Sequence, residues 1–404
     1  MKIIFVNRYF YPDFSATSQI LYDLAKALAR HGFEIEIICS RFSYQNREII
    51  YPRHEVIDGV TVHRVRTSNF GRAGFLGRAV DYLSFYFSSA VQLARRLKEK
   101  DIVVAKTDPP LLSVICGVVA KYKKATLINW MQDVFPEVYS NLGYYCPKWI
   151  LWGLKAARNW SMRIADANVV LGHIMKDQFI EQGIGENSLY VIENWANEGA
   201  RPPVKMQESQ LYKELLLQGK FIVAYSGNLG RAHDYQTLLH AAQLLSIEKD
   251  ILFLVIGGGI GYEKLKENSE KNKIENFLFL PYQKRECLAD VLAAANVHLV
   301  SLLPELEGLI VPSKFYGILA AGRPTIMIGS VNGELARIIE SSELGGVAEV
   351  GNAEELVRHI KNLKNNPSIA EAMGERAYNR YQSSYTLERA VNKWINMIGK
   401  LVKA

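Results

Sequence analysis

The stretch SLLPELEGLIVPSKFYGILAAGRPTIMI, from Ser301 to Ile328, carries the clearest signals in the chain. Pro312 suits the first turn of a helix, where its missing N–H costs nothing, and Gly322 suits the end of the same helix. Ser313 and Lys314 accordingly fall at a helix N-terminus, where backbone N–H groups and the helix dipole favour an anion. We interpret Lys314 as a phosphate-binding residue; an ordinary capped helix with a surface lysine is the alternative.

The bulk composition is that of a globular protein with two or three domains. The chain has 404 residues, of which 49% are apolar and 22% charged. No apolar run approaches the ~20 residues that span a bilayer, and the first ten residues predict a strand rather than a signal peptide. The four cysteines are scattered without metal-ligand or disulfide spacing. We therefore predict a cytoplasmic protein with neither a bound metal nor another cofactor.

The net charge of +7 is concentrated in the first half of the chain. Basic residues outnumber acidic ones in 1–195, and the two kinds nearly balance in 196–404. Such a bias is typical of proteins that bind nucleic acid, anionic lipid or phosphorylated substrates, and equally of a solvated basic face. No basic and aromatic reading motif is present, so we predict no nucleic-acid partner.

Short strands alternate with helices in both halves, which predicts an α/β protein with parallel sheets. Residues 195–219 interrupt this rhythm with prolines and polar residues. We therefore expect two Rossmann-like domains that face each other across a cleft, with a helical C-terminal extension. The expected divisions are an N-terminal acceptor-binding domain, a linker, a nucleotide-sugar-binding domain and a helix that packs back toward the first domain (1–195, 196–219, 220–380 and 381–404).

Ligands of such sheets bind in the loops that follow the strands. In the second half, the loop SGNLGRAHD offers glycines for close backbone approach and two phosphate contacts, Arg231 and His233. The run Gly257–Gly259 lacks the GxGxxG and P-loop patterns, so phosphate binding and a plain connector are equally open. Tyr282 offers a ring face to a nucleobase or packs in the core. The predicted donor-binding residues from these loops are Gly227, Asn228, Gly230, Arg231, His233, Gly257, Gly258, Gly259 and Tyr282.

In the first half, the loop YPDFSATSQ places small and hydroxyl residues after the first strand. It suits a phosphate or sugar, or is a plain N-cap loop. Asp133 follows the strand 125–130 and is the best carboxylate for a ligand in this half, with a turn-forming aspartate as the alternative. The predicted acceptor-binding residues are Ser15, Ala16, Thr17 and Asp133.

The chain resembles retaining nucleotide-sugar glycosyltransferases of the GT-B fold, in glycosyltransferase family four. The similarity rests on VIENWAN (191–197), YSGNLGRAHD (225–234), VIGGG (255–259) and LEGLIVPSKFYGILAAGRPTI (306–326). Two details, QDVFPE and VPSKFYGILAAGRP, are similar to bacterial enzymes that transfer N-acetyl-fucosamine-like sugars in surface polysaccharide assembly, such as O-antigen or capsule.

The resemblance implies roles for particular residues. It implies donor contacts from Glu307, Gly308, Leu309, Ile310, Ser313 and Lys314, and catalytic roles for Asp133, Arg231, Glu307 and Lys314. Arg231 and Lys314 would stabilise the departing diphosphate without a metal, Glu307 would hold sugar hydroxyls, and Asp133 would orient the acceptor or act as base. Gly317 replaces the glutamate that usually binds the ribose. UDP is the usual nucleotide of the family and is the one we expect, but without this glutamate the sequence leaves the nucleotide open. A histidine that often faces the sugar's C6 hydroxyl is replaced near Asp133, which suits a 6-deoxy donor.

Aromatic and basic residues gather in 146–163. Trp149, Trp152, Lys155 and Trp160 suit a helix that lies on an anionic membrane; core packing of the tryptophans is the alternative. The membrane reading implies a protein bound to the inner face of the plasma membrane and a polyprenyl-diphosphate-linked glycan acceptor. Two other functions use the same fold: a nucleotide-sugar epimerase or hydrolase, and a degenerate subunit that only binds nucleotide.

Overall fold

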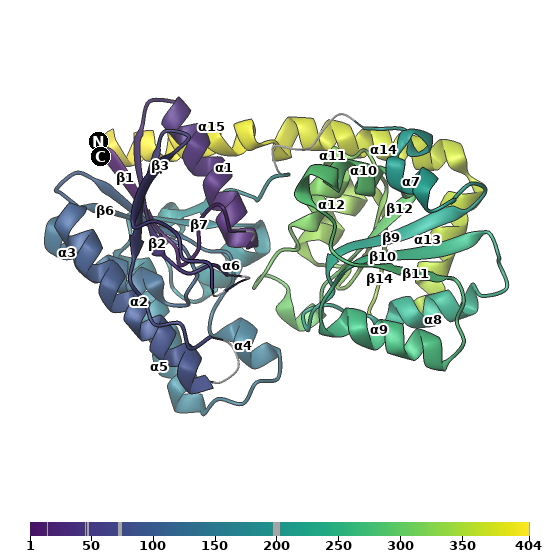
Figure 1. Ribbon diagram of the computed structural model, residues 1–404, viewed down its shortest axis with the longest axis horizontal. Coiled ribbons are helices and arrows are strands. Elements are labelled where there is room, and N and C mark those ends of the chain that lie inside the picture. Colours follow the sequence, from purple (N-terminus) through teal and green to yellow (C-terminus); the bar gives the residue numbers. More distant parts are fainter. Residues whose placement is uncertain (14, 45, 47, 72–74, 197–202, 404) are drawn as a thin grey trace. The chain divides into compact units, whose positions relative to one another are not determined.

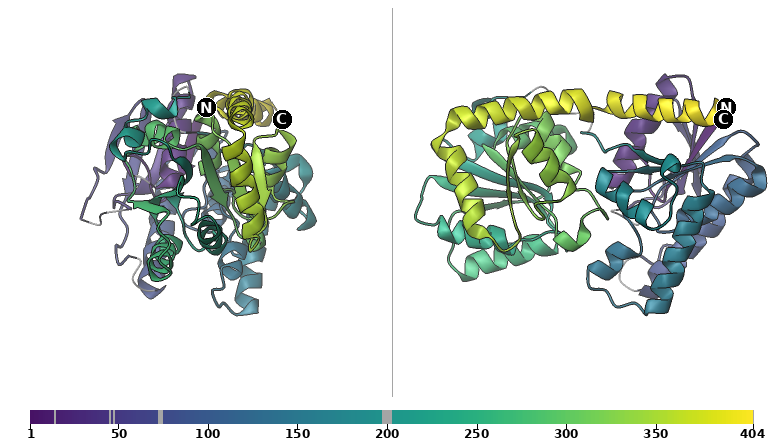
Figure 2. Two further views of the ribbon diagram at one scale, coloured as in Figure 1. Left: turned by 90° about the vertical axis from the view of Figure 1, so that its right-hand side faces the viewer. Right: turned by 180° about the vertical axis from the view of Figure 1, so that it is seen from behind.

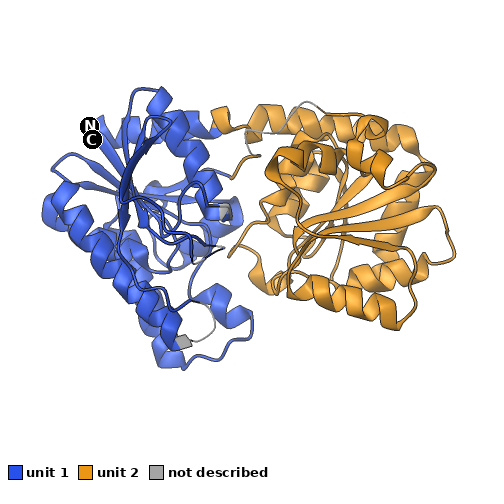
Figure 3. Ribbon diagram, viewed as in Figure 1, with its two compact units in different colours: residues 1–193, 390–404 blue, residues 194–389 orange. Residues whose placement is uncertain are grey.

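The computed structural model describes the chain except residues 14, 45, 47, 72–74, 197–202 and 404 and the side chains of residues 16 and 75. The chain divides into two compact units (Figure 3): unit 1 comprises residues 1–193 and 390–404, and unit 2 comprises residues 194–389. Each unit is built around one twisted, mostly parallel sheet with helices on both faces (Figure 1). The expected pair of Rossmann-like α/β domains is therefore confirmed.

The sheet of unit 1 has the strand order β3-β4-β2-β1-β5-β6-β7-β8. All neighbours are parallel except β3 and β4, which form a hairpin through Asp58-Gly59, as the sequence predicts. The order reverses direction between β1 and β5, which makes this the switch point where ligands of such sheets bind. The strands are β1 (Lys2–Val6), β2 (Glu34–Ser40), β3 (His54–Ile57), β4 (Val60–Val65), β5 (Ile102–Ala105), β6 (Thr126–Trp130), β7 (Ala167–Val170) and β8 (Leu189–Val191).

Helices cover both faces of this sheet because its strands are apolar on both sides. Ile4 and Val6 pack in a core with α2 and α3, while the alternate residue Phe5 contacts Trp394 of α15. Helices α2, α3 and α5 pack side by side on the first of these faces (Figure 2). The helices of unit 1 are α1 (Ala16–Arg30), α2 (Phe75–Arg96), α3 (Leu112–Lys123), α4 (Glu137–Asn141), α5 (Lys148–Ile164), α6 (His173–Glu181) and most of α15 (Leu387–Lys403).

The sheet of unit 2 is parallel throughout, in the order β11-β10-β9-β12-β13-β14, with its switch point between β9 and β12. Its strands are β9 (Phe221–Asn228), β10 (Ile251–Gly258), β11 (Phe277–Leu280), β12 (Val297–Ser301), β13 (Thr325–Ile328) and β14 (Gly345–Ala348). Its helices are α7 (Gln210–Glu214), α8 (Gln236–Leu244), α9 (Ile260–Lys271), α10 (Leu288–Ala293), α11 (Lys314–Ala320), α12 (Glu334–Ser341), α13 (Ala353–Asn365) and α14 (Pro367–Arg380).

Residues 203–219, which we expected to be part of a linker, pack within unit 2. Tyr212 and Leu217 are buried against β9 and β10, because the polar segment hides an apolar face on α7. At the other end of the chain, Trp394 of α15 is buried in unit 1, with its ring 5.0 Å from that of Trp130.

Candidate functional site

Lys314 is the centre of the candidate donor site in unit 2. The loop after β12 brings it to the carboxyl end of β9, at the switch point of the sheet. Its Nζ lies 3.7 Å from the centre of the Tyr225 ring and donates to the carbonyl oxygen of Asn228 at 3.3 Å. Gly227, which has φ +114°, adjoins this lysine, and a Cβ there would lie 3.7 Å from Cε of Lys314, an ordinary van der Waals contact. Burial lowers the pKa of Lys314 to about 7, so an arriving anion would favour its charged form.

The helix that follows contributes less to the site than the sequence suggests. Helix α11 has seven residues, and the N–H groups of Phe315 and Tyr316 already donate to the carbonyl oxygens of Pro312 and Ser313, each at 3.2 Å. Fewer backbone N–H groups at the start of α11 are therefore available to bind an anion than the sequence predicts. The side chain of Lys314 is the stronger attraction for an anion.

His233 organises the loop after β9 rather than carrying charge. Its Nδ1 accepts a hydrogen bond from the N–H of Gly230 at 3.1 Å, so the neutral ring holds its proton on Nε2. Burial, together with the charge of Lys314, lowers the pKa of His233 to about 3. A phosphate contact from His233 would therefore use the neutral Nε2–H as its donor, and this role stays a prediction.

The glycines after β10 are required by close packing against the loop after β9. A Cβ on Gly257, which has φ +138°, would lie 2.1 Å from the carbonyl oxygen of Gly227. A Cβ on Gly259 would lie 2.4 Å from Oδ1 of Asn228. This explains the glycine run without a ligand and shows how it holds the two loops together. The exposed ring of Tyr282 lies beside Gly258, so the predicted aromatic residue does adjoin the glycine loop.

The remaining predicted donor residues divide between surface and core. Arg231 and Ser313 are exposed, Ile310 is half-buried, and Gly308 and Leu309 are buried. Glu307 lies at the start of α12, where its Oε2 accepts from the N–H of Glu334 at 3.2 Å. Burial raises the pKa of Glu307, and the neighbouring charge of Glu334 adds to this. The carboxylate thus caps a helix, a role that the sequence did not predict.

In unit 1, a buried lysine joins two of the predicted acceptor residues. Lys106 follows β5 and is 1% exposed; its Nζ donates to the carbonyl oxygen of Thr17 at 3.0 Å and lies 3.8 Å from the centre of the Trp130 ring. Burial lowers the pKa of Lys106 to about 7, against the opposing charges of Asp108 and Asp133. Burial likewise raises the pKa of Asp133, which Lys106 partly offsets. Asp133 and Lys106 therefore form an electrostatically coupled pair at the carboxyl edge of the sheet.

Ser15 caps helix α1, as the plainer reading of its loop predicts. Its Oγ accepts from the N–H of Ser18 at 3.2 Å and lies 3.4 Å from Oγ1 of Thr17. The backbone of Ala16 begins α1, and its side chain lies outside the described part of the chain.

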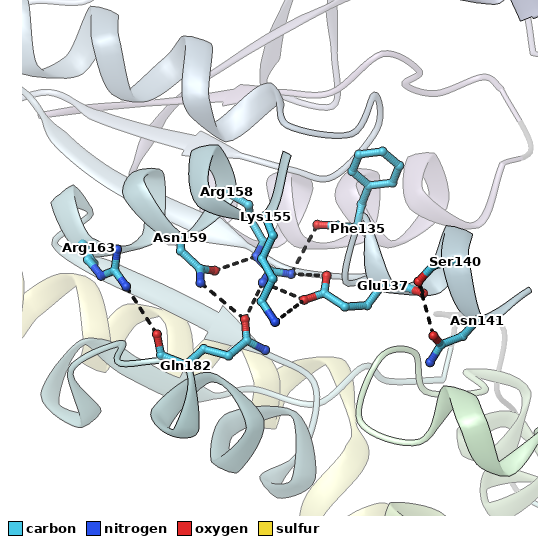
Figure 4. Close-up of polar contacts among 9 residues, drawn as sticks. All are labelled: Phe135, Glu137, Ser140, Asn141, Lys155, Arg158, Asn159, Arg163 and Gln182. Carbon is cyan, nitrogen blue, oxygen red and sulfur yellow. Dashed lines mark hydrogen bonds and ion pairs between the residues drawn. The ribbon is translucent and has the colours of Figure 1, made fainter. Parts of the chain in front are cut away.

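The loop that carries Asp133 is fastened by Arg158 of α5 (Figure 4). This guanidinium is buried and donates to both carboxylate oxygens of Glu137, at 2.7 and 3.0 Å, and to the carbonyl oxygen of Phe135 at 3.2 Å. It also donates to Oε1 of Gln182 at 2.6 Å. A planar guanidinium with several satisfied donors fixes the segment just after Asp133.

The predicted membrane residues on α5 have different environments. Trp149 and Trp152 are each 75% exposed, so core packing of these two side chains is excluded. Trp160 is at the limit of exposure and lies against α3 near Gly117. Lys155 pairs with Glu137 at 3.4 Å and therefore belongs partly to the Arg158 network.

These two units define a class of protein, the GT-B glycosyltransferases. The model of the group 1 glycosyl transferases matches residues 207–380, and the model of the glycosyl transferase 4-like domain matches residues 16–195. The probable glycosyltransferase WbjE of Pseudomonas aeruginosa is 30% identical, over 73% of this chain and 74% of its own length. The chain belongs to this glycosyltransferase family.

Further relatives support the same assignment. The putative colanic acid biosynthesis glycosyl transferase WcaI of Escherichia coli K12 is 22% identical over 98% of this chain and 100% of its own. Two solved structures share the fold: sucrose-phosphate synthase of Thermosynechococcus elongatus (TM-score 0.79, 15% identity, 100% of both chains) and Anabaena Alr3699/HepE in complex with UDP-glucose (TM-score 0.74, 15% identity, 99% of this chain and 100% of that one).

Proposed function

We propose that the protein is a retaining glycosyltransferase that moves a sugar from UDP to a lipid-linked glycan during polysaccharide biosynthesis. The observation that carries the donor half is the position of Lys314 at the switch point of unit 2, where it is half-buried and its Nζ lies 3.7 Å from the centre of the Tyr225 ring. A desolvated lysine with a pKa near 7 gains charge and a partner when a diphosphate binds. The UDP-glucose complex of HepE supports the donor, and the place of WcaI in colanic acid biosynthesis supports the process.

The proposed chemistry needs no group beyond the substrates and the side chains described. The bond from the sugar's C1 to the phosphate oxygen breaks as a bond from C1 to the acceptor oxygen forms on the same face. The acceptor proton moves to the departing phosphate. Lys314 and Arg231 stabilise the negative charge that develops there, a contribution of about 3–4 kcal/mol per donor in comparable sites. Asp133, coupled to Lys106, orients the acceptor hydroxyl for this transfer.

Two finer assignments belong to this proposal. The donor is UDP-linked, with Tyr282 as the surface for the base. Its sugar is a 6-deoxy N-acetylamino sugar, because the buried Gln132 and the exposed Asp133 stand where family members often carry a histidine. Among the described residues, no group of three or more histidine, cysteine or acidic side chains is arranged to hold a metal ion. Metal independence stays a prediction.

A thermal-shift screen with nucleoside diphosphates and UDP-sugars tests the donor half. Ligand that binds the folded state raises the melting temperature by mass action. UDP and one UDP-sugar should stabilise the wild type and leave Lys314→Ala unchanged, while Lys284→Ala, a change to an exposed lysine of the same unit, should respond normally. Absence of any nucleotide effect on the wild type would support the degenerate-subunit alternative instead.

We further propose that unit 1 rests on an anionic membrane through the outward faces of α2, α3 and α5. These adjacent helices contain one acidic residue, Asp81, which is buried, and many lysines and arginines. Their exposed large apolar side chains among the described residues are Leu76, Val80, Leu83, Phe87, Val118, Tyr122, Trp149, Trp152 and Trp160. Apolar and aromatic groups surrounded by cations suit the interface of an anionic bilayer. None of the described helices is long and apolar enough to cross a membrane.

Vesicle sedimentation tests this second proposal. We expect the protein to sediment with phosphatidylglycerol-containing vesicles and not with pure phosphatidylcholine. The double variant Trp149→Gln/Trp152→Gln should lose about tenfold or more in binding, because two exposed aromatic anchors are removed. Ile247→Gln, which replaces an equally exposed apolar residue of unit 2, should bind like the wild type. Equal sedimentation of the double variant would contradict the proposal.

A further inference from the structure

Unit 1 contains a polar pocket that the proposed chemistry does not use. Its volume is about 510 Å³, within the range of small-molecule sites. The lining residues come from the loops after β1, β2, β4 and β5 and from the first turns of α2, and all belong to unit 1. They are Arg8, Tyr9, Ser43, Tyr44, Asn69, Gly71, Arg78, Asp81, Tyr82 and Asp108.

One wall of the pocket is fixed by Asp81 of α2. Its Oδ1 accepts from the N–H of Phe70 at 2.9 Å and from the hydroxyl of Ser68 at 2.7 Å. Its Oδ2 accepts from the N–H of Gly71 at 2.8 Å and lies 3.5 Å from Nη2 of Arg8. These hydrogen bonds keep the pKa of Asp81 low despite its burial. Asp81 thus holds the loop after β4 in place.

A second buried carboxylate fixes the opposite wall. Oδ1 of Asp13 accepts from the hydroxyl of Ser43 at 2.7 Å and from the N–H of Tyr44 at 2.9 Å. Burial raises the pKa of Asp13 in spite of these bonds, so holding this loop costs free energy. The loop after β4 is therefore held by hydrogen bonds to Asp81, and the loop after β2 by hydrogen bonds to Asp13. The pocket is shaped before any ligand arrives.

Arg8 lies across the pocket between two rings. Its guanidinium carbon is 5.2 Å from the centre of the Tyr9 ring and 5.0 Å from that of Tyr82, and the Tyr44 ring meets Tyr9 edge-on at 5.1 Å. Among the described residues, the buried Nε of Arg8 has no hydrogen-bond partner. An arginine stacked in this way presents donors in a fixed plane beside aromatic faces.

We propose that this pocket binds an uncharged sugar of the acceptor glycan; the inference rests on the proposed transferase function. The two arginines are matched by two aspartates, so the pocket has no excess charge to hold a diphosphate. Sugar hydroxyls both donate and accept, which fits a wall that offers guanidinium, amide, hydroxyl and carboxylate groups. The tyrosine rings suit the C–H face of a pyranose.

The position of Asp108 connects this pocket to the proposed chemistry. Asp108 lines the pocket, and its charge acts on Lys106, which is coupled in turn to Asp133. All of these residues follow β5 or β6 at one edge of the sheet. The pocket and Asp133 therefore lie at the same edge of one sheet.

Saturation-transfer NMR on the intact protein tests the assignment, with methyl glycosides of glucose, galactose, N-acetylglucosamine and N-acetylgalactosamine as probes. A single ring in such a site binds with millimolar affinity, so each probe is used at about 10 mM. We expect at least one glycoside to bind the wild type and Tyr82→Phe, and about fivefold weaker binding in Tyr82→Ala. Lys314→Ala should bind the glycoside normally, since that residue belongs to unit 2.

Three results would overturn the assignment: no glycoside binds the wild type, Tyr82→Ala binds as well as the wild type, or inorganic pyrophosphate binds in a Tyr82-dependent way while the glycosides do not. UDP binding to the same samples is measured in parallel. If UDP binds and the glycosides fail, the pocket assignment alone is wrong. If glycosides bind and UDP fails, sugar binding by the pocket stands, but the UDP-dependent transferase proposal is contradicted and the assignment of that sugar to an acceptor falls with it. UDP binding by Tyr82→Ala also shows that this variant is folded.

Discussion

The lowered pKa of Lys314 predicts that nucleotide binding takes up a proton. With a pKa of about 7 in the free protein, the protonated fraction falls from about half at pH 7 to about 3% at pH 8.5. Only the charged lysine favours a diphosphate, and the bound anion raises its pKa. The affinity for UDP should therefore fall about 15-fold over this interval, or ~1.6 kcal/mol. His233 and Tyr225 do not titrate in this window, because burial moves the pKa of the first to about 3 and that of the second well above 10.

Titration calorimetry in buffers of different ionisation enthalpy measures this proton directly. At pH 8 we expect an uptake close to one proton per UDP bound. Lys314→Arg is the matched control, because a guanidinium stays charged throughout the range and should give weaker pH dependence and no uptake. An uptake near zero in the wild type, or the same pH dependence in Lys314→Arg, would refute the assignment of a desolvated lysine to the diphosphate.

Three further predictions concern stability. The native pKa of Lys106 lies below its unfolded value of about 10.4, so the free-energy cost of burying the charged lysine is greatest below pH 7. Lys106→Met should therefore raise the melting temperature more at pH 6.5 than at pH 9.5. Arg158→Met removes the buried partner of Glu137, so it should lower the free energy of unfolding by about 3–5 kcal/mol and speed hydrogen exchange in residues 134–141. Arg163→Met, at an exposed site, should have neither effect. Gly257→Ala should destabilise unit 2 by about 2 kcal/mol or more and weaken UDP binding. Gly153→Ala should do neither, because the added Cβ has open space around it. Melting curves with and without UDP measure both effects.

The parts of the fold that follow hydrophobic period were predictable from the sequence. The strand after Lys2 and the helix before His31 appear where apolar spacing places them. The meeting of Lys314 with the loop after β9 was also predictable in outline, because loops at the carboxyl ends of parallel strands converge. The exposure of Trp149 and Trp152 could not be predicted from the sequence, because their spacing is the same whether that helix face packs in a core or lies on the surface.

The residues that the sequence analysis missed depend on contacts distant in the chain. Lys106 was not among the predicted site residues, although a lysine at the end of a buried strand is a signal that could have been used. Arg8 and Asp81 are 73 positions apart in the chain, and nothing in their local sequence indicates that they share a pocket wall. The bond from the N–H of Glu334 to Glu307 is likewise revealed only by the fold, and the contact of Glu307 with the sugar stays a prediction.

The central claim, sugar transfer from a nucleotide to a lipid-linked glycan, is tested most directly by measuring UDP release. Purified protein is incubated with a panel of UDP-sugars that includes 6-deoxy sugars, with and without a lipid-linked glycan fraction from bacterial membranes. We predict that one UDP-sugar releases UDP only when the lipid fraction is present, with formation of a longer glycan, and that Lys314→Ala and Asp133→Asn lose this activity. Equal UDP release with and without the lipid fraction, or full activity in both variants, would contradict the account.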